Sequence, residues 1–301
     1  MSNKKIEIDD KIFIAGVTGM AGQAIKRNLI KSGYKNLLTP NRKELNFFNL
    51  EDVKKWFLEN KPDIVIIAAA KVGGILANSS QPTQFLLDNL KIQNNLIETS
   101  WKSDVKRLLF LGSSCIYPKF ASQPIKEEEL LKGSLEKTNQ WYAVAKIAGI
   151  KLCEALREQY NFDAISLMPT NLYGPGDNYH PDNSHVMASL IRKFLTASKK
   201  SLPKVNCWGT GSVYREFLHS DDLGSAVVFA LENWDPSSIN APLDVEGNPL
   251  NMLNVGTGID ITIKELVNLI ASEVNFKGIV KWDSSKPDGT PKKLLNIERL
   301  S

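Results

Sequence analysis

The stretch that decides the fold is residues 11–30, KIFIAGVTGMAGQAIKRNLI. Its first five residues, KIFIA, are apolar and rich in β-branched and aromatic side chains, which favours a buried strand. Glycines at positions 16, 19 and 22 follow, and a helical pattern then runs through Leu29 and Ile30. This order of strand, glycine turn and helix is typical of dinucleotide sites, because glycine lets the backbone approach a diphosphate and the helix start presents free N–H groups. A tight loop alone would also explain the glycines, but their place between strand and helix favours the cofactor site.

Residues 37–43, LLTPNRK, take the place of the second strand in such a fold. A chain that binds NAD would carry an acid near the end of this strand to hold the ribose 2′-hydroxyl. No acid is present here, and Arg42 and Lys43 stand where a 2′-phosphate would lie. The stretch therefore favours NADP, with ordinary surface charges as the alternative reading.

Apolar strands alternate with longer helical patterns through the first half of the chain. This alternation predicts an α/β fold built on a doubly wound parallel Rossmann sheet, whose ligands gather at the carboxyl ends of the strands. The predicted strands are residues 63–70, 108–112 and 163–168, and the predicted helices are residues 84–101 and 141–160.

A second, smaller substrate-binding lobe is expected after residue 173, where a polar loop at residues 176–184 precedes a helix at residues 186–197. We therefore divide the chain into a Rossmann domain, residues 1–173, and a lobe, residues 174–301. The chain is expected to return to the sheet around residues 217–258, through apolar stretches at residues 217–231 and 250–255, with residues 237–249 as an excursion loop. Thr262 and Glu265 form a capping box that predicts a helix to about residue 274.

Composition excludes several classes of protein. The chain has 301 residues, 43% of them hydrophobic, which is enough for a large core. Lysine and arginine number 37 against 33 acids, and they are scattered, so nucleic acid is not indicated as a partner. The longest apolar run, residues 64–70, is too short to span a membrane and the amino terminus is charged, so a cytoplasmic protein is expected. The three cysteines are too far apart to suggest a disulfide framework or a metal site.

Tyr142 precedes Lys146 by one helical turn in the stretch WYAVAK, which places the two side chains on one helix face. An ammonium there would lower the pKa of the tyrosine and make it a proton carrier for a carbonyl or an alcohol. A solvated helix face is the alternative for such a pair when it occurs alone.

Five further motifs accompany this pair: GSSCIYP at 112–118, PTNLYGPGDNYHPDNSHV at 169–186, WGTGSVYREFLHSDD at 208–222, NVGTG at 254–258 and SKPDGTPKKLL at 285–295. Together with the glycine turn they resemble the extended short-chain dehydrogenase/reductases, and within these the GDP-L-fucose synthase family, over residues 11–300. The resemblance implies an enzyme that epimerises GDP-4-keto-6-deoxy-D-mannose at C3 and C5 and then reduces it at C4 with NADPH. It also implies a homodimer that uses the helix at residues 141–160.

The resemblance carries catalytic roles onto five residues. Ser113 would position the carbonyl, Tyr142 would transfer the proton and Lys146 would tune it. Cys115 would act as the base and His185 as the acid of epimerisation, because a 4-keto group acidifies the neighbouring C–H bonds. The alternatives are a small buried hydrophobe for Cys115 and a hydrogen-bonded loop residue for His185.

The resemblance also assigns ligand contacts, and no metal. Guanosine diphosphate would be held by positive charge for its diphosphate, by a flat apolar surface, and by a carboxylate acceptor for its ribose or base. These contacts fall on Lys193, Trp208, Arg215 and Asp288, with a solvated helix face as the alternative for Lys193. The NADP contacts fall on Gly16, Val17, Thr18, Gly19, Met20, Ala21, Gly22, Arg42, Lys43, Leu111, Gly112, Ser113, Ser114, Lys146, Pro169, Thr170, Asn171, Leu172 and His185.

Two departures from the family pattern stand out. Thr18 occupies a place where some relatives carry an arginine for the 2′-phosphate, so Arg42 and Lys43 must supply most of the NADP selectivity. The chain also ends just after the last motif, where relatives continue through a further helix, so the substrate lobe is expected to be short at its C-terminus. Two rival functions stay open: an NAD(P)-dependent 4-epimerase or dehydratase of the same fold acting on another nucleotide sugar, and a non-catalytic NADP sensor.

Overall fold

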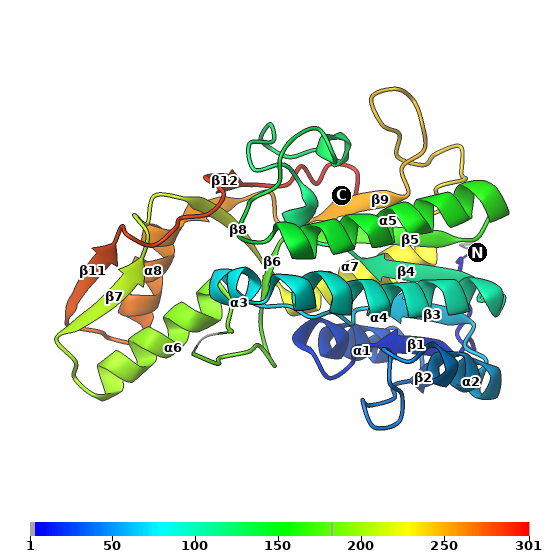
Figure 1. The fold of residues 1–301 in the computed structure, drawn as a ribbon, viewed down its shortest axis with the longest axis horizontal. Helices are drawn as coiled ribbons and strands as arrows, with labels where there is room; N and C mark the ends of the chain where they lie inside the picture. Colours follow the sequence, from blue (N-terminus) through cyan, green and yellow to red (C-terminus); the bar gives the residue numbers. More distant parts are fainter. Residues whose placement is uncertain (1–3, 182, 301) are drawn as a thin grey trace.

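The computed structural model describes residues 4–181 and 183–300. Its centre is a six-stranded parallel sheet with the strand order β2-β1-β3-β4-β5-β9 (Figure 1). The chain passes from β1 to β2 on one side and then crosses to β3 on the other, so a topological switch point lies beside β1. Ligands of such sheets bind outside the carboxyl ends of the strands at that point. The strands are β1 (Ile12–Ala15), β2 (Leu37–Leu38), β3 (Ile64–Ile67), β4 (Arg107–Leu111), β5 (Ala164–Pro169) and β9 (Met252–Val255).

Helices cover both faces of this sheet. Alternate side chains of a strand point to opposite faces. In β1, Phe13 accordingly packs in one core cluster and Ile14 in the other. The first face is covered by α2 (Leu50–Asn60), α4 (Pro82–Lys102) and α5 (Gln140–Tyr160), and the second by α1 (Met20–Lys31) and α7 (Ser220–Asn233). The doubly wound parallel fold predicted from the sequence is confirmed.

The predicted elements of the first half are present with small shifts of their ends. β3 and β4 correspond to the predicted strands at residues 63–70 and 108–112, and α4 and α5 correspond to the predicted helices. β2 is only two residues long, so most of the stretch at residues 37–43 is loop. A short helix that the sequence analysis did not identify, α3 (Ile75–Ser80), precedes α4.

A separate hydrophobic cluster lies at the end of the molecule away from both termini (Figure 1). It joins α6 (Val186–Lys199) and α8 (Ile263–Glu273) to a parallel pair of strands, β7 (Lys204–Trp208) and β11 (Ile279–Asp283). The capping box predicted at the start of α8 is present, since Thr262 and Glu265 exchange side-chain and backbone hydrogen bonds. The division of the chain at residue 173 stays a prediction.

A smaller sheet connects this cluster to the central sheet. Its middle strand is β8 (Tyr214–His219), which pairs with β6 (Asn171–Tyr173), β10 (Asp260–Thr262) and β12 (Lys292–Lys293). The apolar stretch at residues 217–231 was expected to return to the central sheet. Instead it contributes to β8 and to α7, which covers the central sheet, and only β9 extends that sheet. Short apolar runs do not distinguish a strand from a buried helix.

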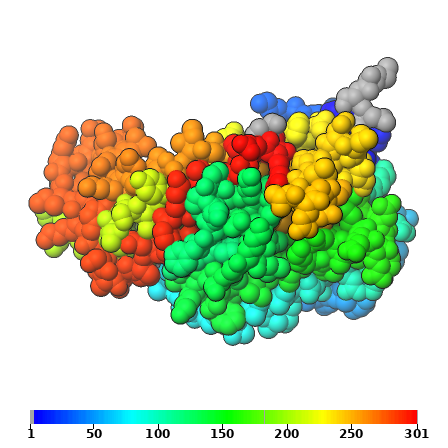
Figure 2. Space-filling model, turned by 90° about the horizontal axis from the view of Figure 1, so that it is seen from above, coloured from blue at the N-terminus to red at the C-terminus, as the bar shows by residue number. Residues whose placement is uncertain are grey.

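The segment after β12 returns to the body of the molecule. Figure 2 shows this red segment lying against the green part of the surface. Ile125 and Leu295 form a parallel bridge, and Arg299 pairs with Glu127 and Glu128. These contacts hold β12 over the loop that follows β4. Within the described residues, no helix is long and apolar enough to cross a membrane.

Candidate active site

The glycine turn between β1 and α1 is shaped for close approach of a ligand. Gly16 has a φ of +91°, and a Cβ there would lie 2.6 Å from the Ala69 backbone nitrogen. A Cβ at Gly22 would lie 2.3 Å from the Gly16 carbonyl oxygen, whereas one at Gly19 would meet only that oxygen, at 3.5 Å. Gly19 is the N-cap of α1 and brings no side chain to cap it. The helix start is therefore open to an anion, and the turn fits the diphosphate of a dinucleotide.

Arg42 and Lys43 lie on the neighbouring loop. β1 and β2 pair in parallel, with Phe13 opposite Leu38, so the chain leaves both strands at the same edge of the sheet. Both basic side chains are exposed, and Asn41 fixes the loop by accepting a hydrogen bond from the Lys43 backbone nitrogen at 2.8 Å. The loop therefore presents two cations on the side of the sheet where the glycine turn lies.

Ser113, Tyr142 and Lys146 meet beyond the carboxyl end of β4. Ser113 is the N-cap of the short 3₁₀ helix at Ser114–Ile116, where its Oγ accepts a hydrogen bond of 3.2 Å from the Cys115 backbone nitrogen, and its side chain acts to lower the pKa of Tyr142. Lys146, on α5, is buried and donates a hydrogen bond of 2.7 Å to the Leu111 carbonyl. Its Nζ lies 6.0 Å from the centre of the Tyr142 ring. The structure therefore places Lys146 one helical turn after Tyr142 and ties it to the end of β4, directly before the segment that carries Ser113.

The pKa of Tyr142 does not follow the sequence-based expectation. Burial raises it above its ordinary value, the negative charge of Cys115 raises it further, and the hydrogen bond from Ser113 opposes both. Burial also lowers the pKa of Lys146 to about 7, so its ammonium is only partly populated at neutral pH. The prediction that Lys146 lowers the pKa of Tyr142 is wrong for this structure, because burial of the phenol raises that pKa and Lys146 is not among the groups that shift it.

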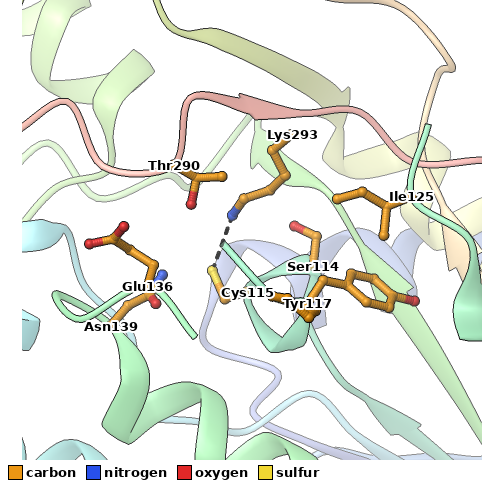
Figure 3. A pocket seen from close by; sticks show the side chains of 9 residues that line it. Ser114, Cys115, Tyr117, Ile125, Glu136, Asn139, Thr290 and Lys293 are labelled. Carbon is orange, nitrogen blue, oxygen red and sulfur yellow. Dashed lines mark hydrogen bonds between the residues drawn. The ribbon is translucent and has the colours of Figure 1, made fainter. Parts of the chain in front are cut away.

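Cys115 lies two residues after Ser113 in the same 3₁₀ turn, and its Sγ accepts a hydrogen bond from Lys293 Nζ at 3.4 Å (Figure 3). Burial raises the pKa of the thiol, but the Lys293 charge, the hydrogen bonds from Ser113 and Lys293, and the Arg215 charge together bring it below its ordinary value. Cys115 is thus a partly exposed thiol in electropositive surroundings, which is the setting of a reactive cysteine rather than of an inert one.

His185 is the exposed N-cap residue of α6. Desolvation lowers the pKa of its imidazole, Asp177 opposes this shift and Lys293 adds to it. Lys293 therefore acts electrostatically on both His185 and Cys115, which places the predicted acid and base around one cation.

The residues predicted to hold guanosine diphosphate gather between β7, β8 and the loop before β12. Trp208 is 43% exposed, and the ammonium groups of Lys193 and Lys286 lie 5.9 and 5.5 Å from its ring centre. Arg215 donates a hydrogen bond of 3.0 Å to the Asp288 carbonyl. The Asp288 carboxylate accepts two hydrogen bonds of 2.9 Å from Thr210, one from its backbone nitrogen and one from its hydroxyl. The structure brings all four predicted residues together, with Asp288 also holding the loop at Thr210.

The other predicted cofactor residues follow β4 and β5. Gly112 is enclosed, since a Cβ there would lie 2.3 Å from the Met168 sulfur. The Thr170 hydroxyl and the Asn171 amide both donate to the Glu216 carbonyl, at 3.3 and 2.8 Å. These bonds fix the chain that leaves β5 against β8. Val17, Thr18, Met20 and Ala21 complete the turn and the first turn of α1, Ser114 and Leu172 lie on the segments after β4 and β5, and Pro169 is the last residue of β5.

Comparison with known proteins agrees with this geometry. Residues 12–241 match the family model described as the NAD dependent epimerase/dehydratase family. The chain is 51% identical to "Probable GDP-L-fucose synthase 1" of Oryza sativa subsp. japonica, covering 96% of this chain and 85% of the relative. It is 50% identical to the GDP-L-fucose synthase of Escherichia coli K12, covering 96% and 89%. The chain belongs to the GDP-L-fucose synthases of the epimerase/dehydratase family.

Among solved structures, the GDP-mannoheptose C4 reductase MlghC from Campylobacter jejuni, with NADP bound, superposes with a TM-score of 0.84. The two chains share 36% identity, and the match covers 98% of this chain and 92% of the other. This match therefore includes the parallel sheet, the glycine turn and the second hydrophobic cluster.

Sequence reasoning missed two residues at this GDP-L-fucose synthase site. Lys293 was quoted only as part of a motif, and Asn139, the N-cap of α5, was not singled out. Both line a small cavity beside Cys115, and the buried Asn139 Oδ1 has no hydrogen-bond partner among residues 4–181 and 183–300. The available signal for Lys293 was its place in the motif at residues 285–295, but only folding shows that it, and not Lys292, points inward.

Proposed function

We propose that this chain converts GDP-4-keto-6-deoxy-D-mannose to GDP-L-fucose, by epimerisation at C3 and C5 followed by NADPH-dependent reduction at C4. The observation that carries the proposal is that the groups for carbonyl reduction, the reactive cysteine and its neighbouring cation lie at one place. Ser113 and Cys115 both act on the pKa of Tyr142, Cys115 lies two residues after Ser113, and Lys293 contacts the Cys115 sulfur. A simple reductase would need only the serine, tyrosine and lysine, so the electropositive cysteine favours added epimerase chemistry.

Epimerisation requires proton transfer on both faces of the sugar. A Cys115 thiolate removes the proton from C3 or C5, and the electron pair of the broken C–H bond moves onto the 4-keto oxygen as an enolate. His185 donates a proton from the opposite face. Its exposure at the start of α6 leaves the imidazole accessible to the sugar, and its lowered pKa makes the imidazolium a stronger acid.

Reduction requires a proton on the oxygen at C4. The raised pKa keeps Tyr142 protonated at neutral pH, which suits a donor to the carbonyl oxygen, and the neighbouring Ser113 hydroxyl would orient that oxygen. NADPH, when bound, supplies the hydride. The uncapped start of α1 and the enclosed glycines at positions 16 and 22 would hold its diphosphate, and Arg42 and Lys43 its 2′-phosphate.

The GDP group would lie against Trp208, with Lys193 and Arg215 supplying positive charge and Asp288 an acceptor. Trp208 offers an exposed flat surface beside two ammonium groups, which suits a planar base with an adjoining diphosphate. This placement assigns the cluster around α6, α8, β7 and β11 to the substrate, which supports a substrate-binding unit beginning after residue 173.

A homodimer is part of the same proposal. α4 and α5 lie side by side on one face of the molecule (Figure 1). They carry large apolar side chains with 40–49% of their surface exposed, namely Leu87, Trp141, Val144 and Tyr160. A second copy of the chain would cover them. Sedimentation equilibrium should show a dimer that Val144→Glu weakens, and a monomer at micromolar concentration would refute this part of the proposal.

Deuterium exchange tests the function directly. The keto-sugar is incubated in deuterated water with NADPH and each variant, and the products are analysed by mass spectrometry. Tyr142→Phe should lower NADPH oxidation by about 10²–10⁴-fold while deuterium still enters C3 and C5. Cys115→Ser should abolish deuterium incorporation at C3 and C5 while NADPH oxidation persists, because a serine hydroxyl is too weak an acid to supply the base. Undiminished deuterium incorporation by Cys115→Ser would remove Cys115 from the mechanism. The unmodified protein must form GDP-L-fucose, since another deoxyhexose would favour a rival function.

A further inference from the structure

Lys293 is a buried lysine whose ammonium contacts a sulfur atom. Only 8% of its surface is exposed, and its Nζ lies 3.4 Å from Cys115 Sγ although the two residues are separated by 178 positions (Figure 3). Within the described residues, no carboxylate lies within 4.0 Å of this Nζ. Burying an ammonium costs free energy unless an anion or acceptors compensate it. The sulfur of Cys115 is thus the group placed to compensate the Lys293 charge.

The fold points Lys293 inward and its neighbour outward. β12 pairs in parallel with β8, with Lys292 opposite Tyr214 and Lys293 opposite Arg215. Successive side chains of a strand point to opposite faces. Lys292 is accordingly more exposed, at 41% of its side chain, and its Nζ lies 3.4 Å from Asp260. The two adjacent lysines therefore differ in environment while sharing the same strand.

Backbone bonds on the far side of β12 fix this orientation. The Ile125 nitrogen donates to the Leu294 carbonyl at 2.7 Å, and the Leu294 nitrogen donates to the Gln123 side-chain oxygen at 2.9 Å. The strand end is thus tied to the loop after Cys115 as well as to β8. A one-residue slip would exchange the two lysines, and these bonds oppose it.

The contact sits in a small enclosed space. The cavity has a volume of about 10 Å³, room for about one water molecule. Its one carboxylate is that of Glu136, which is paired with Lys119 at 2.7 Å. An ammonium and a thiolate attract each other more strongly where water is scarce. The lining residues are Ser114, Cys115, Tyr117, Pro118, Ile125, Glu136, Asn139, Thr290 and Lys293.

We propose that Lys293 is a positioning residue that holds Cys115 as a thiolate through direct contact with its sulfur, so that Cys115 can accept a proton from the sugar. The use of that thiolate in epimerisation rests on the proposed function, whereas the thiolate itself is measurable without substrate.

The charges that face the sulfur come from several elements. Lys293 on β12 and Arg215 on β8 favour the thiolate, and the neighbouring Ser113 side chain also lowers the pKa of the thiol. The phenol of Tyr142 on α5 is a further titratable group beside the sulfur, and the negative charge of the Cys115 thiolate raises the pKa of that phenol. Lys293 is the cation in contact with the sulfur, so its removal should change the thiol most.

The proton balance of the base step follows from this pairing. The C–H bond at C3 or C5 breaks, an S–H bond forms on Cys115, and the electron pair remains on the sugar as the enolate. When His185 returns a proton on the other face, the thiolate and imidazolium have become a thiol and a neutral imidazole, so total charge is conserved. Lys293 also lowers the pKa of His185, which makes its imidazolium a stronger acid and a smaller fraction of the residue at neutral pH.

The pH profile of Cys115 alkylation tests the proposal on the full-length protein. Iodoacetamide reacts with thiolates, forming an S–C bond as iodide leaves, and peptide mass spectrometry assigns the modified cysteine. Cys153 and Cys207 are buried and serve as internal references. The variants are Lys293→Met, which removes the charge, Lys293→Arg, which keeps it, and Lys292→Met as the matched control. Circular dichroism and Tm verify that each variant is folded.

Lys293→Met should raise the midpoint of the Cys115 profile by at least about one pH unit and slow alkylation at pH 7 about tenfold. Lys293→Arg should restore most of the shift, and Lys292→Met should leave the midpoint in place. An unchanged midpoint in folded Lys293→Met would overturn the proposal. The unmodified protein supplies a second test that does not depend on a variant: a Cys115 midpoint at or above about 8.5, the value of a free thiol, would overturn it as well.

The two proposals fail in different ways. A midpoint that moves with Lys293 in a protein that exchanges no deuterium supports the pair and refutes the proposed epimerisation. If deuterium exchange depends on Cys115 but the pH midpoint of Cys115 alkylation does not change in Lys293→Met, epimerisation is supported and the positioning role of Lys293 is refuted.

Discussion

The glycine turn and the Cys115 cavity lie at the carboxyl edge of the same sheet, but they are built in different ways. The turn is one continuous segment: a Cβ at Gly22 would meet the backbone of Gly16 and Val17 within it, and only the enclosure of Gly16 by the Ala69 backbone comes from a distant part of the chain. The cavity joins Cys115 to Lys293, 178 residues away, through paired strands and buried side chains. A site made of backbone atoms is therefore specified largely by a short motif, whereas a site made of charges depends on the whole fold.

The largest effect is expected at the turn. Gly22→Ala places a Cβ 2.3 Å from the Gly16 carbonyl oxygen, so the backbone must shift. NADPH affinity should fall at least 100-fold, and the free energy of unfolding should fall by about 1–3 kcal/mol. Gly19→Ala is the matched control because its Cβ would meet that oxygen at an ordinary 3.5 Å. Fluorescence titration and thermal unfolding measure both changes, and equal affinities for the two variants would contradict the steric account.

A second prediction concerns the tie that holds β12 over Cys115. Arg299→Met leaves the buried carboxylate of Glu127, 1% exposed, without its cation, and should lower the free energy of unfolding by about 3 kcal/mol at pH 7. The hydrogen bond from Arg299 is the main cause of the lowered pKa of Glu128. A carboxyl group whose pKa is lower in the folded than in the unfolded state stabilises the protein when the pH is above its unfolded-state pKa. This stabilisation is lost as the pH falls through its folded-state pKa. The difference between variant and unmodified protein should therefore shrink below about pH 4.

Urea unfolding at several pH values checks this prediction. Lys132→Met is the control, because Lys132 makes an exposed pair with Glu129 at 3.5 Å. Such surface pairs contribute about 0–1 kcal/mol. A difference for Arg299→Met that stayed constant from pH 7 to pH 3 would show that the carboxylates are not its origin.

The third prediction concerns the nucleotide end of the assembled site. Arg215→Ala and Trp208→Ala should raise KM for the GDP-sugar about tenfold or more while lowering kcat less, because both residues would hold the part of the substrate that does not react. Tyr214→Ala is the control, since Tyr214 alternates with Arg215 on β8 and points to the other face. Steady-state kinetics separates the two constants, and unchanged KM values would refute the assignment.

The smallest effect is expected at Arg42. If Arg42 binds the 2′-phosphate, Arg42→Ala should reduce the preference for NADPH over NADH in kcat/KM by about tenfold, or about 1.4 kcal/mol. Lys35→Ala, which removes another exposed cation near β2, should not alter the preference. Equal kcat/KM for the two cofactors in the unmodified protein would sink the NADP assignment.

The sequence by itself determined the local features. The strand and glycine turn of residues 11–22, the long α5 with Tyr142 and Lys146, and the capping box of Thr262 and Glu265 all depend on residues within a few positions of one another. Their physics is local: hydrophobic periodicity, glycine conformation and helix capping. Motif resemblance extended this reading to Cys115, His185 and the nucleotide contacts.

The tertiary structure decided what depends on burial and on distant partners. Residues 220–233 form a helix, which the sequence did not reveal because an apolar stretch of that kind suits a buried helix as well as a strand. The pKa of Tyr142 is raised because the phenol is buried, and burial cannot be read from the spacing of Tyr142 and Lys146. Lys293 reached Cys115 only because β12 pairs with β8 in one register. Electrostatic strength depends on distance and on exclusion of water, and both are fixed only when the chain has folded.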